Sequence, residues 1–156
     1  MNKYANFSCK DLEQEETSLA FESFSHETAL ELGQFALSII KDAPIAMEVR
    51  KGNHLVFKAS MKGTSQDNDW WLNRKFKAAD RFGHSSLWVK KKFQEMGQDF
   101  EVDSGLDQDL YAAHGGVVPI ILSGTGMVGG IGISGLPDLE DHRYAVEILE
   151  KYKKNN

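Results

Sequence analysis

The sequence predicts one mixed α/β domain (α+β type) in which helices cover a mainly antiparallel sheet. The chain has 156 residues, enough for one ordinary domain with its own core but few for two. Its apolar content of 41% and charged content of 26% are typical of globular proteins. Segments of helical periodicity alternate with pairs of short apolar runs. Each pair is joined by a turn of hairpin length, which favours antiparallel pairing.

The first clear helix is predicted over about residues 25–41. Ser25 can accept hydrogen bonds from the first-turn amides, and Pro44 prevents continuation of the helix. The apolar stripe of this helix is Ala29, Leu32, Ala36, Ile39 and Ile40. Strand-like runs follow over 45–50 and 54–59, and the Lys-Gly-Asn between them favours a hairpin turn.

Two helices are predicted next. One covers about residues 69–82 and ends at Gly83, which can adopt a left-handed cap. Its core-facing residues are Leu72, Phe76, Ala79 and Phe82. The other begins at the capping residues Ser85 and Ser86 and ends before Gly97. The acidic stretch that follows has no regular period and is predicted to be irregular.

The last part of the chain predicts a second hairpin and a closing helix. The strands cover 117–123 and 127–134, and the helix runs over about 138–152, with acids at its start and lysines at its end. Residues 124–129 match the dinucleotide pattern G-x-G-x-x-G. That chemistry requires a helix after the loop, whereas a strand is predicted here, so we reject nicotinamide binding.

The first 20 residues have no clean period and are rich in acids. We expect an N-terminal arm over 1–20, ordered against a partner subunit, and a single domain over 21–156. Neither a signal-peptide core nor an apolar run of about 20 residues is visible. The lone Cys9 suits a reducing compartment. We therefore predict a cytoplasmic protein without a membrane partner, and the net charge of −5 argues against nucleic acid.

A basic and aromatic stripe follows one face of the helix predicted over 69–82. Its members, spaced i, i+4, i+7 and i+11, are Trp70, Arg74, Lys77 and Arg81. Such a stripe can hold a carboxylate, phosphate or propionate beside an aromatic ring. It can equally be a solvated face or half of an ion-pair interface.

Glycines provide two further candidate ligand contacts. His114, Gly115 and Gly116 can form an anion-binding concavity with a histidine, or merely a sharp entry into the next strand. Gly130 and Gly132 alternate along a strand, so both face the same side. A bare strand face admits either a closely packed helix or a flat ligand.

Histidines supply the candidate acid–base groups. His142 follows Asp141 in the first turn of the last helix, where the pair is either acid–base machinery or a match to the helix dipole. His84 precedes the capping Ser85 and belongs either to a helix-start loop or to a ligand site. No zinc-binding spacing is present, so we predict no metal site.

Several segments together resemble the haem-degrading-domain family, also described as GlcG-like or haem-binding-protein-like, and in particular its uncharacterised branch. The resemblance covers about residues 12–152. It is carried by the order and spacing of FSHETALELG (24–33), GTSQDNDWW (63–71), Arg74-Lys75, RFGHSS (81–86), AHGG (113–116), Pro119, Gly124-x-Gly126, SGLP (134–137) and Asp141-His142.

The resemblance implies a profilin-like three-layer fold, homo-oligomers built from dimers and, in some relatives, non-covalent haem binding. In that case Arg74, Lys75 and Lys77 would meet carboxylates, and His84 or His114 would approach the iron.

Three hypotheses of function follow. The first is an oligomeric binding protein for a small anionic or planar ligand, with haem as the named candidate cofactor. The second is an enzyme acting on a small carboxylate metabolite, with His114 or His142 as acid–base. The third is an assembly protein without a ligand. The candidate ligand-binding residues are Trp70, Arg74, Lys75, Lys77, His84, Ser85, His114, Gly115, Gly116, Gly130 and Gly132.

Overall fold

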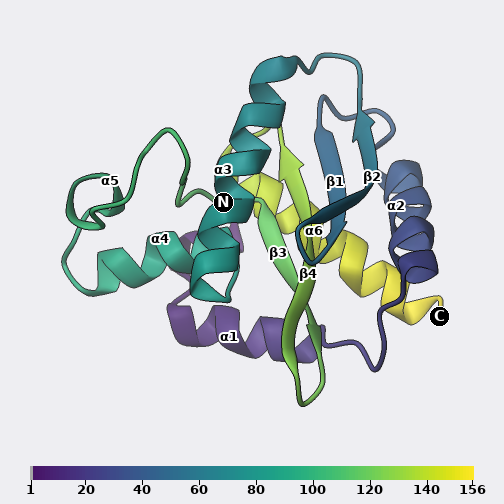
Figure 1. Cartoon of the computed structure of the whole chain (residues 1–156), viewed down its shortest axis with the longest axis horizontal. Helices are drawn as coiled ribbons and strands as arrows, with labels where there is room; N and C mark the ends of the chain where they lie inside the picture. The colour runs from purple at the N-terminus through teal and green to yellow at the C-terminus, as the bar shows by residue number, and fades with distance from the viewer. Residues whose placement is uncertain (1) are drawn as a thin grey trace.

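The computed structural model describes residues 2–156 and shows three layers (Figure 1). A four-stranded sheet lies between α3 on one face and α2 with α6 on the other, while α1 and α4 pack beside the β3 edge. The elements are η1 (Lys3–Asn6), α1 (Cys9–Ser18), α2 (His26–Ile40), β1 (Ala46–Lys51), β2 (His54–Ser60), α3 (Gln66–Phe82), α4 (Ser86–Glu95), α5 (Phe100–Asp103), β3 (Val117–Leu122), β4 (Gly126–Ser134) and α6 (Asp138–Lys154).

The sheet has the order β2-β1-β4-β3, and every neighbouring pair of strands is antiparallel. This confirms the predicted fold class. β3 and β4 form the second hairpin, so the G-x-G-x-x-G stretch lies in a turn and its outgoing strand, not before a helix. An isolated parallel bridge from Phe21 to Leu122 extends the β3 edge.

The two faces of the sheet are packed differently. Towards α2 and α6, the strands present large apolar side chains such as Val49, Ile131 and Ile133, which belong to the main core. Towards α3, they present smaller groups around Phe76 of α3. An added Cβ on Gly130 or Gly132 would lie 3.1 or 2.5 Å from the Phe76 ring. Phe76 of α3 occupies the face of these two glycines, which agrees with the alternative of a closely packed helix and leaves no room there for a flat ligand.

The predicted helix starts are largely confirmed. Ser25 and Ser85 are N-caps whose hydroxyls accept from Thr28 N and Trp88 N, and Gly83 has the left-handed φ of 73°. The helix α3 begins three residues earlier than expected. Its N-cap is Ser65, which exchanges hydrogen bonds with Asn68 in a capping box.

The segment before residue 21 differs from the expected arm, because it packs on this chain itself. Tyr4 of η1 and Leu12 of α1 are buried in the main core, and Leu19 joins them. The buried face of α1 also carries the carboxylate of Glu16. A charged residue in so short an apolar stripe explains why its periodicity is weak in the sequence.

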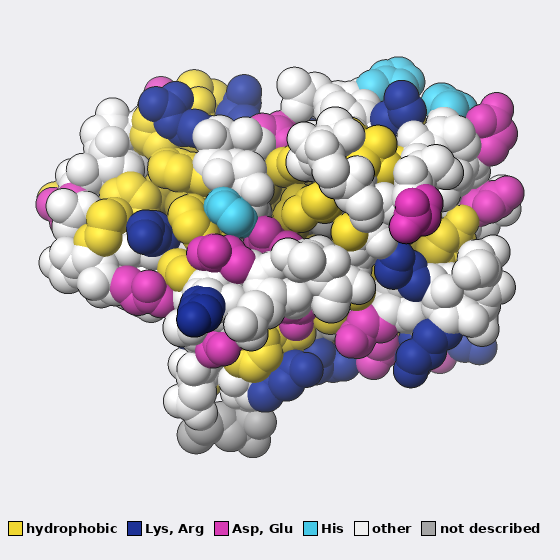
Figure 2. All heavy atoms as spheres, turned by 90° about the horizontal axis from the view of Figure 1, so that it is seen from below, with side chains coloured by type: hydrophobic (Ala, Val, Ile, Leu, Met, Phe, Trp, Pro, Cys, Tyr) yellow, Lys and Arg dark blue, Asp and Glu magenta, His cyan; other side chains and the backbone are white. Residues whose placement is uncertain are grey.

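The acidic stretch after α4 is mostly irregular, as predicted, but it contains the short helix α5. Phe100 anchors this helix in a small cluster with Phe93 and Ala113. Figure 2 shows hydrophobic side chains gathered on the surface at the end of the molecule that α4 and α5 form. Within residues 2–156, no helix combines the length and apolar character needed to span a membrane.

Candidate functional site

Arg74 lies at the centre of the candidate site, on the outer part of α3. Its guanidinium carbon is 4.0 Å from the ring centroid of Trp70 and 4.5 Å from that of Trp71. Its Nε donates to the carbonyl of Gln108 at 2.9 Å. The residue is only 9% exposed. Two aromatic rings and one backbone acceptor therefore fix the orientation of the guanidinium.

The terminal nitrogens of Arg74 have no acidic partner. Nη1 is buried and donates to no acceptor among residues 2–156, and no carboxylate of those residues lies within 4 Å of the guanidinium. Burial lowers the pKa of Arg74, although an arginine stays protonated at neutral pH. A buried cation without a counter-ion is costly, so this arrangement favours an anion from outside.

The first cavity beside Arg74 has a volume of about 240 Å³ and lies between α3, α4 and the segment around α5. Besides Arg74 it carries two potential cations, Lys90 and His114, and two acids, Asp99 and Glu101. The remaining lining is Gln94, Gln98, Phe100, Gln108, Ala112 and Ala113. Cations, amide donors and a small apolar floor suit a small carboxylate.

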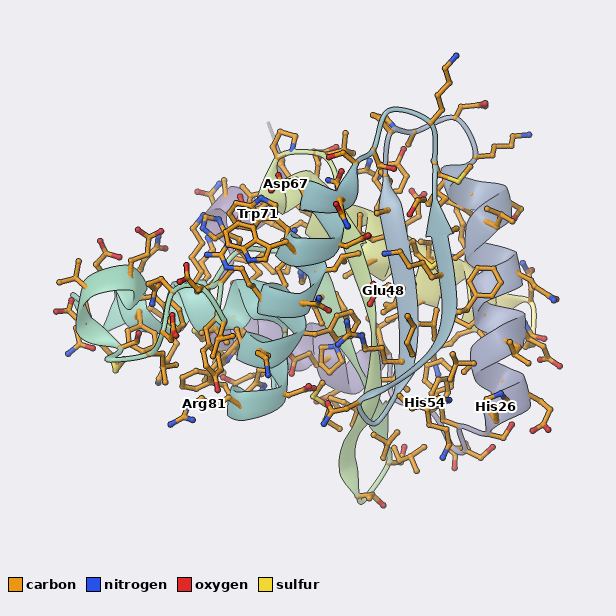
Figure 3. The ribbon with its side chains drawn as sticks, turned by 45° about the horizontal axis from the view of Figure 1, so that its top comes forward. His26, Glu48, His54, Asp67, Trp71 and Arg81 are labelled. Carbon is orange, nitrogen blue, oxygen red and sulfur yellow. The ribbon has the colours of Figure 1, made fainter. Side chains whose placement is uncertain are left out.

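The second cavity follows the predicted stripe along α3 and has a volume of about 830 Å³. Trp70, Arg74, Lys77 and Arg81 all line it, so the structure brings the four stripe residues to one concave surface. Figure 3 shows Trp71 near the start of α3 and Arg81 near its end. The Trp70 ring is 44% exposed and can stack on a ligand.

Lys75 does not share this surface, although it follows Arg74 in the chain. Its side chain is 3% exposed, and its Nζ lies 3.1 Å from Asp141 Oδ2 and 3.1 Å from the carbonyl oxygen of Ile133. Burial lowers the pKa of Lys75 and raises that of Asp141 to about 6. Because Asp141 neutralises it, the geometry gives no support to the carboxylate contact expected of Lys75 with a bound haem.

His114 separates two cavities. It lines the first cavity and also a third, of about 280 Å³, into which Lys75 and Asp141 face. Its ring meets that of Trp71 edge-on, with centroids 5.2 Å apart. Burial lowers the pKa of His114, so its imidazole is neutral at pH 7 and can accept a proton.

The glycines after His114 serve close backbone packing. Gly115 N donates to Asp138 Oδ2 at 3.0 Å, and a Cβ on Gly115 would lie 2.4 Å from the carbonyl oxygen of Asp138. Gly116 has a φ of +144°, and a Cβ there would lie 2.8 Å from Lys75 Nζ. The first amide of the predicted concavity is thus already bonded to a carboxylate.

The other two candidate histidines lie away from these cavities and bond to α1. His84 Nδ1 is 2.7 Å from Glu16 Oε1, and its ring stacks on Trp88. Ser85 N donates to the same carboxylate, and Ser85 Oγ serves as a helix cap. The predicted ligand roles of His84 and Ser85 therefore have no support in the site geometry.

His142 is 1% exposed, and its Nε2 lies 2.9 Å from Glu15 Oε1, which is itself half-buried. Tyr4 covers the ring edge-on at a centroid distance of 4.5 Å. His142 lines none of the three cavities around Arg74 and Lys75. Its predicted acid–base role does not agree with this enclosed position, and its contacts attach the N-terminal segment to α6.

Sequence reasoning missed several residues of the site. Trp71 contacts both Arg74 and His114, Gln108 orients Arg74, and the Lys90–Asp138 pair borders the first and third cavities with a distance of 3.1 Å. The two consecutive tryptophans close to Arg74 in the sequence could have indicated that both rings contact its side chain. Gln108 acts through its backbone carbonyl, which every residue has, so the residue type could not predict this role.

Haem, the cofactor that the family resemblance implies, needs a planar slot and an axial ligand. The two cavities that His114 lines are about 240 and about 280 Å³, both below the range of about 300–1,000 Å³ for ligand pockets. The larger cavity of about 830 Å³ has Tyr111 in its lining but no histidine, cysteine or methionine, and charged groups dominate it. The residues around Arg74 therefore do not fit haem within one chain.

Comparison with curated proteins finds relatives over most of the chain. A UPF0303 protein of Streptomyces coelicolor is 39% identical over 144 residues, which cover 91% of each chain. A UPF0303 protein of Psychromonas ingrahamii is 36% identical over 145 residues, 92% of this chain and 91% of its own.

Solved structures and a family model agree with this. The crystal structure of Ybr137w protein is similar with a TM-score of 0.87 and 30% identity, covering 96% of this chain and 90% of that one. The crystal structure of HbpS, at 16% identity and a TM-score of 0.61, shares the fold over 83% of this chain and 89% of its own. The model described as "Haem degrading protein HbpS-like" matches residues 24–150. The chain therefore belongs to the HbpS-like family, within a group of UPF0303 proteins.

Proposed function

We propose that this protein binds a small carboxylate in the cavity between Arg74 and His114. The observation that carries the proposal is the buried guanidinium of Arg74, which two tryptophans and a backbone carbonyl orient but which has no carboxylate within 4 Å among residues 2–156. A bound carboxylate would accept from its free N–H groups in the geometry that arginine favours.

The neighbouring residues support a small ligand over a large one. Lys90 and Gln94 of α4 and Gln98 after this helix add donors, while Phe100 and Ala113 give a short apolar wall. The cavity volume of about 240 Å³ lies below the range of about 300–1,000 Å³ for ligand pockets, which favours a small ligand. We therefore place a short-chain carboxylic acid here, in a protein that acts in the cytoplasm.

Tryptophan fluorescence provides a direct test, because Trp70 and Trp71 both touch Arg74. Acetate, glycolate, lactate and succinate are titrated at constant ionic strength, with chloride as the reference anion. We expect a saturable change for at least one acid, and Arg74→Ala should weaken that binding by about 1.5–3 kcal/mol. Lys77→Ala is the matched control, since Lys77 is exposed and does not line this cavity.

Two results of this titration would contradict the proposal: no saturable response to any of the acids, or equal affinities of the Arg74→Ala variant and the parent. Haemin is included as a separate titrant. A saturable Soret shift that His114→Ala abolishes would show that haem is bound in spite of the small cavity.

We also propose that the protein forms homo-oligomers built from dimers. Support comes from large apolar side chains that remain exposed on neighbouring elements, Leu30 and Leu37 of α2 and Leu55 of β2. Burying such groups between copies is favourable. Light scattering that returned the chain mass of 17.5 kDa at micromolar concentration would exclude this.

A further inference from the structure

The amine of Lys75 lines a cavity although it is almost completely buried. An ammonium group has three donors. Two of those of Lys75 have acceptors, Asp141 Oδ2 and the carbonyl oxygen of Ile133, and residues 2–156 supply no acceptor for the remaining one. The cavity has a volume of about 280 Å³, and its lining includes Trp71, His114 and Ser134. A buried amine with a free position beside such a cavity is available for chemistry.

The backbone around this amine is shaped closely to it. Gly116 takes a φ of +144°, which side-chain-bearing residues rarely adopt, and any Cβ there would lie 2.8 Å from Nζ and 2.3 Å from the carbonyl oxygen of Ile133. Glycine at this position therefore leaves the space that the amine occupies. A side chain at this position would meet first the carbonyl oxygen of Ile133, which accepts from Nζ, so glycine lets this acceptor and the amine lie close together.

The charges around the cavity decide which ligands it accepts. Asp67, Asp138 and Asp141 line it. Lys90 pairs with Asp138 and Lys75 with Asp141, so Asp67 is the acid of this lining without a cationic partner among residues 2–156. Burial lowers the pKa of His114, which is therefore neutral. An anion would meet these carboxylates, while an uncharged polar molecule could bond to Ser134 and His114. The cavity thus favours a small ligand without negative charge.

We propose that Lys75 is a nucleophilic amine that forms an imine with a small uncharged aldehyde or ketone in this cavity. The neutral amine adds to the carbonyl carbon, and a proton passes from nitrogen to the carbonyl oxygen. The resulting carbinolamine loses water and leaves a carbon–nitrogen double bond. Asp141, 3.1 Å from Nζ, takes the proton from nitrogen and returns it to the departing oxygen.

Burial makes both partners suitable for these roles. It lowers the pKa of Lys75, so more of the amine is neutral at a given pH than for an exposed lysine. It raises the pKa of Asp141 to about 6, close to the range in which an acid–base group works best. This site is distinct from the carboxylate site at Arg74, and the two share only the wall that His114 forms.

The test is reductive trapping with propanal as the probe and sodium cyanoborohydride as the reductant. Cyanoborohydride delivers hydride to the imine carbon, so each imine becomes a stable propyl-lysine that peptide mass mapping locates. We expect Lys75 of the native protein to be modified at pH 7 several-fold faster than exposed Lys77. Modification of Lys77 and other exposed lysines while Lys75 stays unmodified would overturn the proposal.

Two variants sharpen the result. Lys75→Arg keeps a cation beside Asp141 but cannot form an imine, so the fast phase of labelling should disappear. Asp141→Asn removes the carboxylate that takes the proton from nitrogen and returns it to the departing oxygen, so labelling at Lys75 should slow several-fold at neutral pH. Labelling at the parent rate would remove Asp141 from the proposed step. Uniform labelling of all lysines would indicate unfolded protein and count against a specific site. The fluorescence titration at Arg74 is a separate readout, so either proposal can fail alone.

Discussion

Arg74 and Lys75 are consecutive cations on one helix, both more than nine-tenths buried, yet their surroundings are opposite. Lys75 points towards β4 and α6 and is neutralised by Asp141. Arg74 points to the other side of α3, between two tryptophans, and has no acidic partner within 4 Å among residues 2–156. A turn of about 100° per residue in a helix is sufficient to separate them.

The two residues show how a buried cation that stabilises the fold differs from one that is suited to bind an anion. Removing the partner of a paired charge leaves the other charge buried and uncompensated, which destabilises the folded state. Removing an unpaired guanidinium leaves no uncompensated charge in the chain. Binding of an external anion, in contrast, stabilises the guanidinium. Stability and binding should therefore respond in opposite ways at the two positions.

The largest expected effect follows from removing each cation in turn. Lys75→Met leaves Asp141 buried without its cation, and we expect the free energy of unfolding to fall by about 3–5 kcal/mol. Arg74→Met loses the contact with the two rings and the hydrogen bond to the Gln108 carbonyl, but it also removes a buried cation that has no acidic partner, so the net loss should stay below about 2 kcal/mol. Urea unfolding of both variants at pH 7 measures the difference. Equal losses would mean that the two cations do not differ as the structure indicates.

The sequence shows how much of this contrast could be predicted. The helix that carries both cations was predicted, and Arg74 was named from its residue type and spacing as a candidate anion contact. The pairing of Lys75 was not predictable, because its partner lies 66 residues later in another helix. Local periodicity assigns a residue to a helix but does not identify which distant carboxylate the fold brings to it.

A third side of α3, the one that carries Phe76, packs on the glycine-rich strand β4, and the tightness of this packing can be tested. Phe76 packs on Gly132, where a Cβ would lie 2.5 Å from the ring, so Gly132→Ala overpacks this contact. We expect a loss of about 1–3 kcal/mol in the free energy of unfolding. Thr125→Ala at the exposed tip of the hairpin is the control and should change stability by less than about 0.5 kcal/mol. If Gly132→Ala left the free energy of unfolding unchanged, the face of β4 towards α3 would have room for a side chain at this position.

The N-terminal segment shows where sequence reasoning fails for a physical reason. Consecutive carboxylates attach α1: Glu15 contacts His142 and Tyr4, while Glu16 contacts His84 and Ser85 N. In the sequence these acids indicate a solvated arm. Only the tertiary fold brings two histidines from α6 and the start of α4 to them, so neither composition nor period reveals the attachment.

The smallest expected effect is a pH dependence at this attachment. The hydrogen bond to Glu16 raises the pKa of His84, with Glu13 contributing in the same direction and partial burial acting against both. A raised pKa means that the folded state binds the proton more tightly than the unfolded state, whose histidines titrate near about 6.5. The stabilisation is therefore complete below that pH and is lost as the pH rises through the pKa of the folded state.

Glu16→Gln tests this, because the amide keeps an acceptor for Ser85 N but removes the charge that favours protonated His84. We expect the variant to be less stable than the parent by at most about 1 kcal/mol at pH 6, since the His84 side chain is 31% exposed. The difference in the free energy of unfolding should shrink by pH 9, where His84 is neutral in both proteins. A difference that is the same at pH 6 and pH 9 would show that Glu16 holds α1 through the Ser85 amide alone, without an ionic contribution from His84.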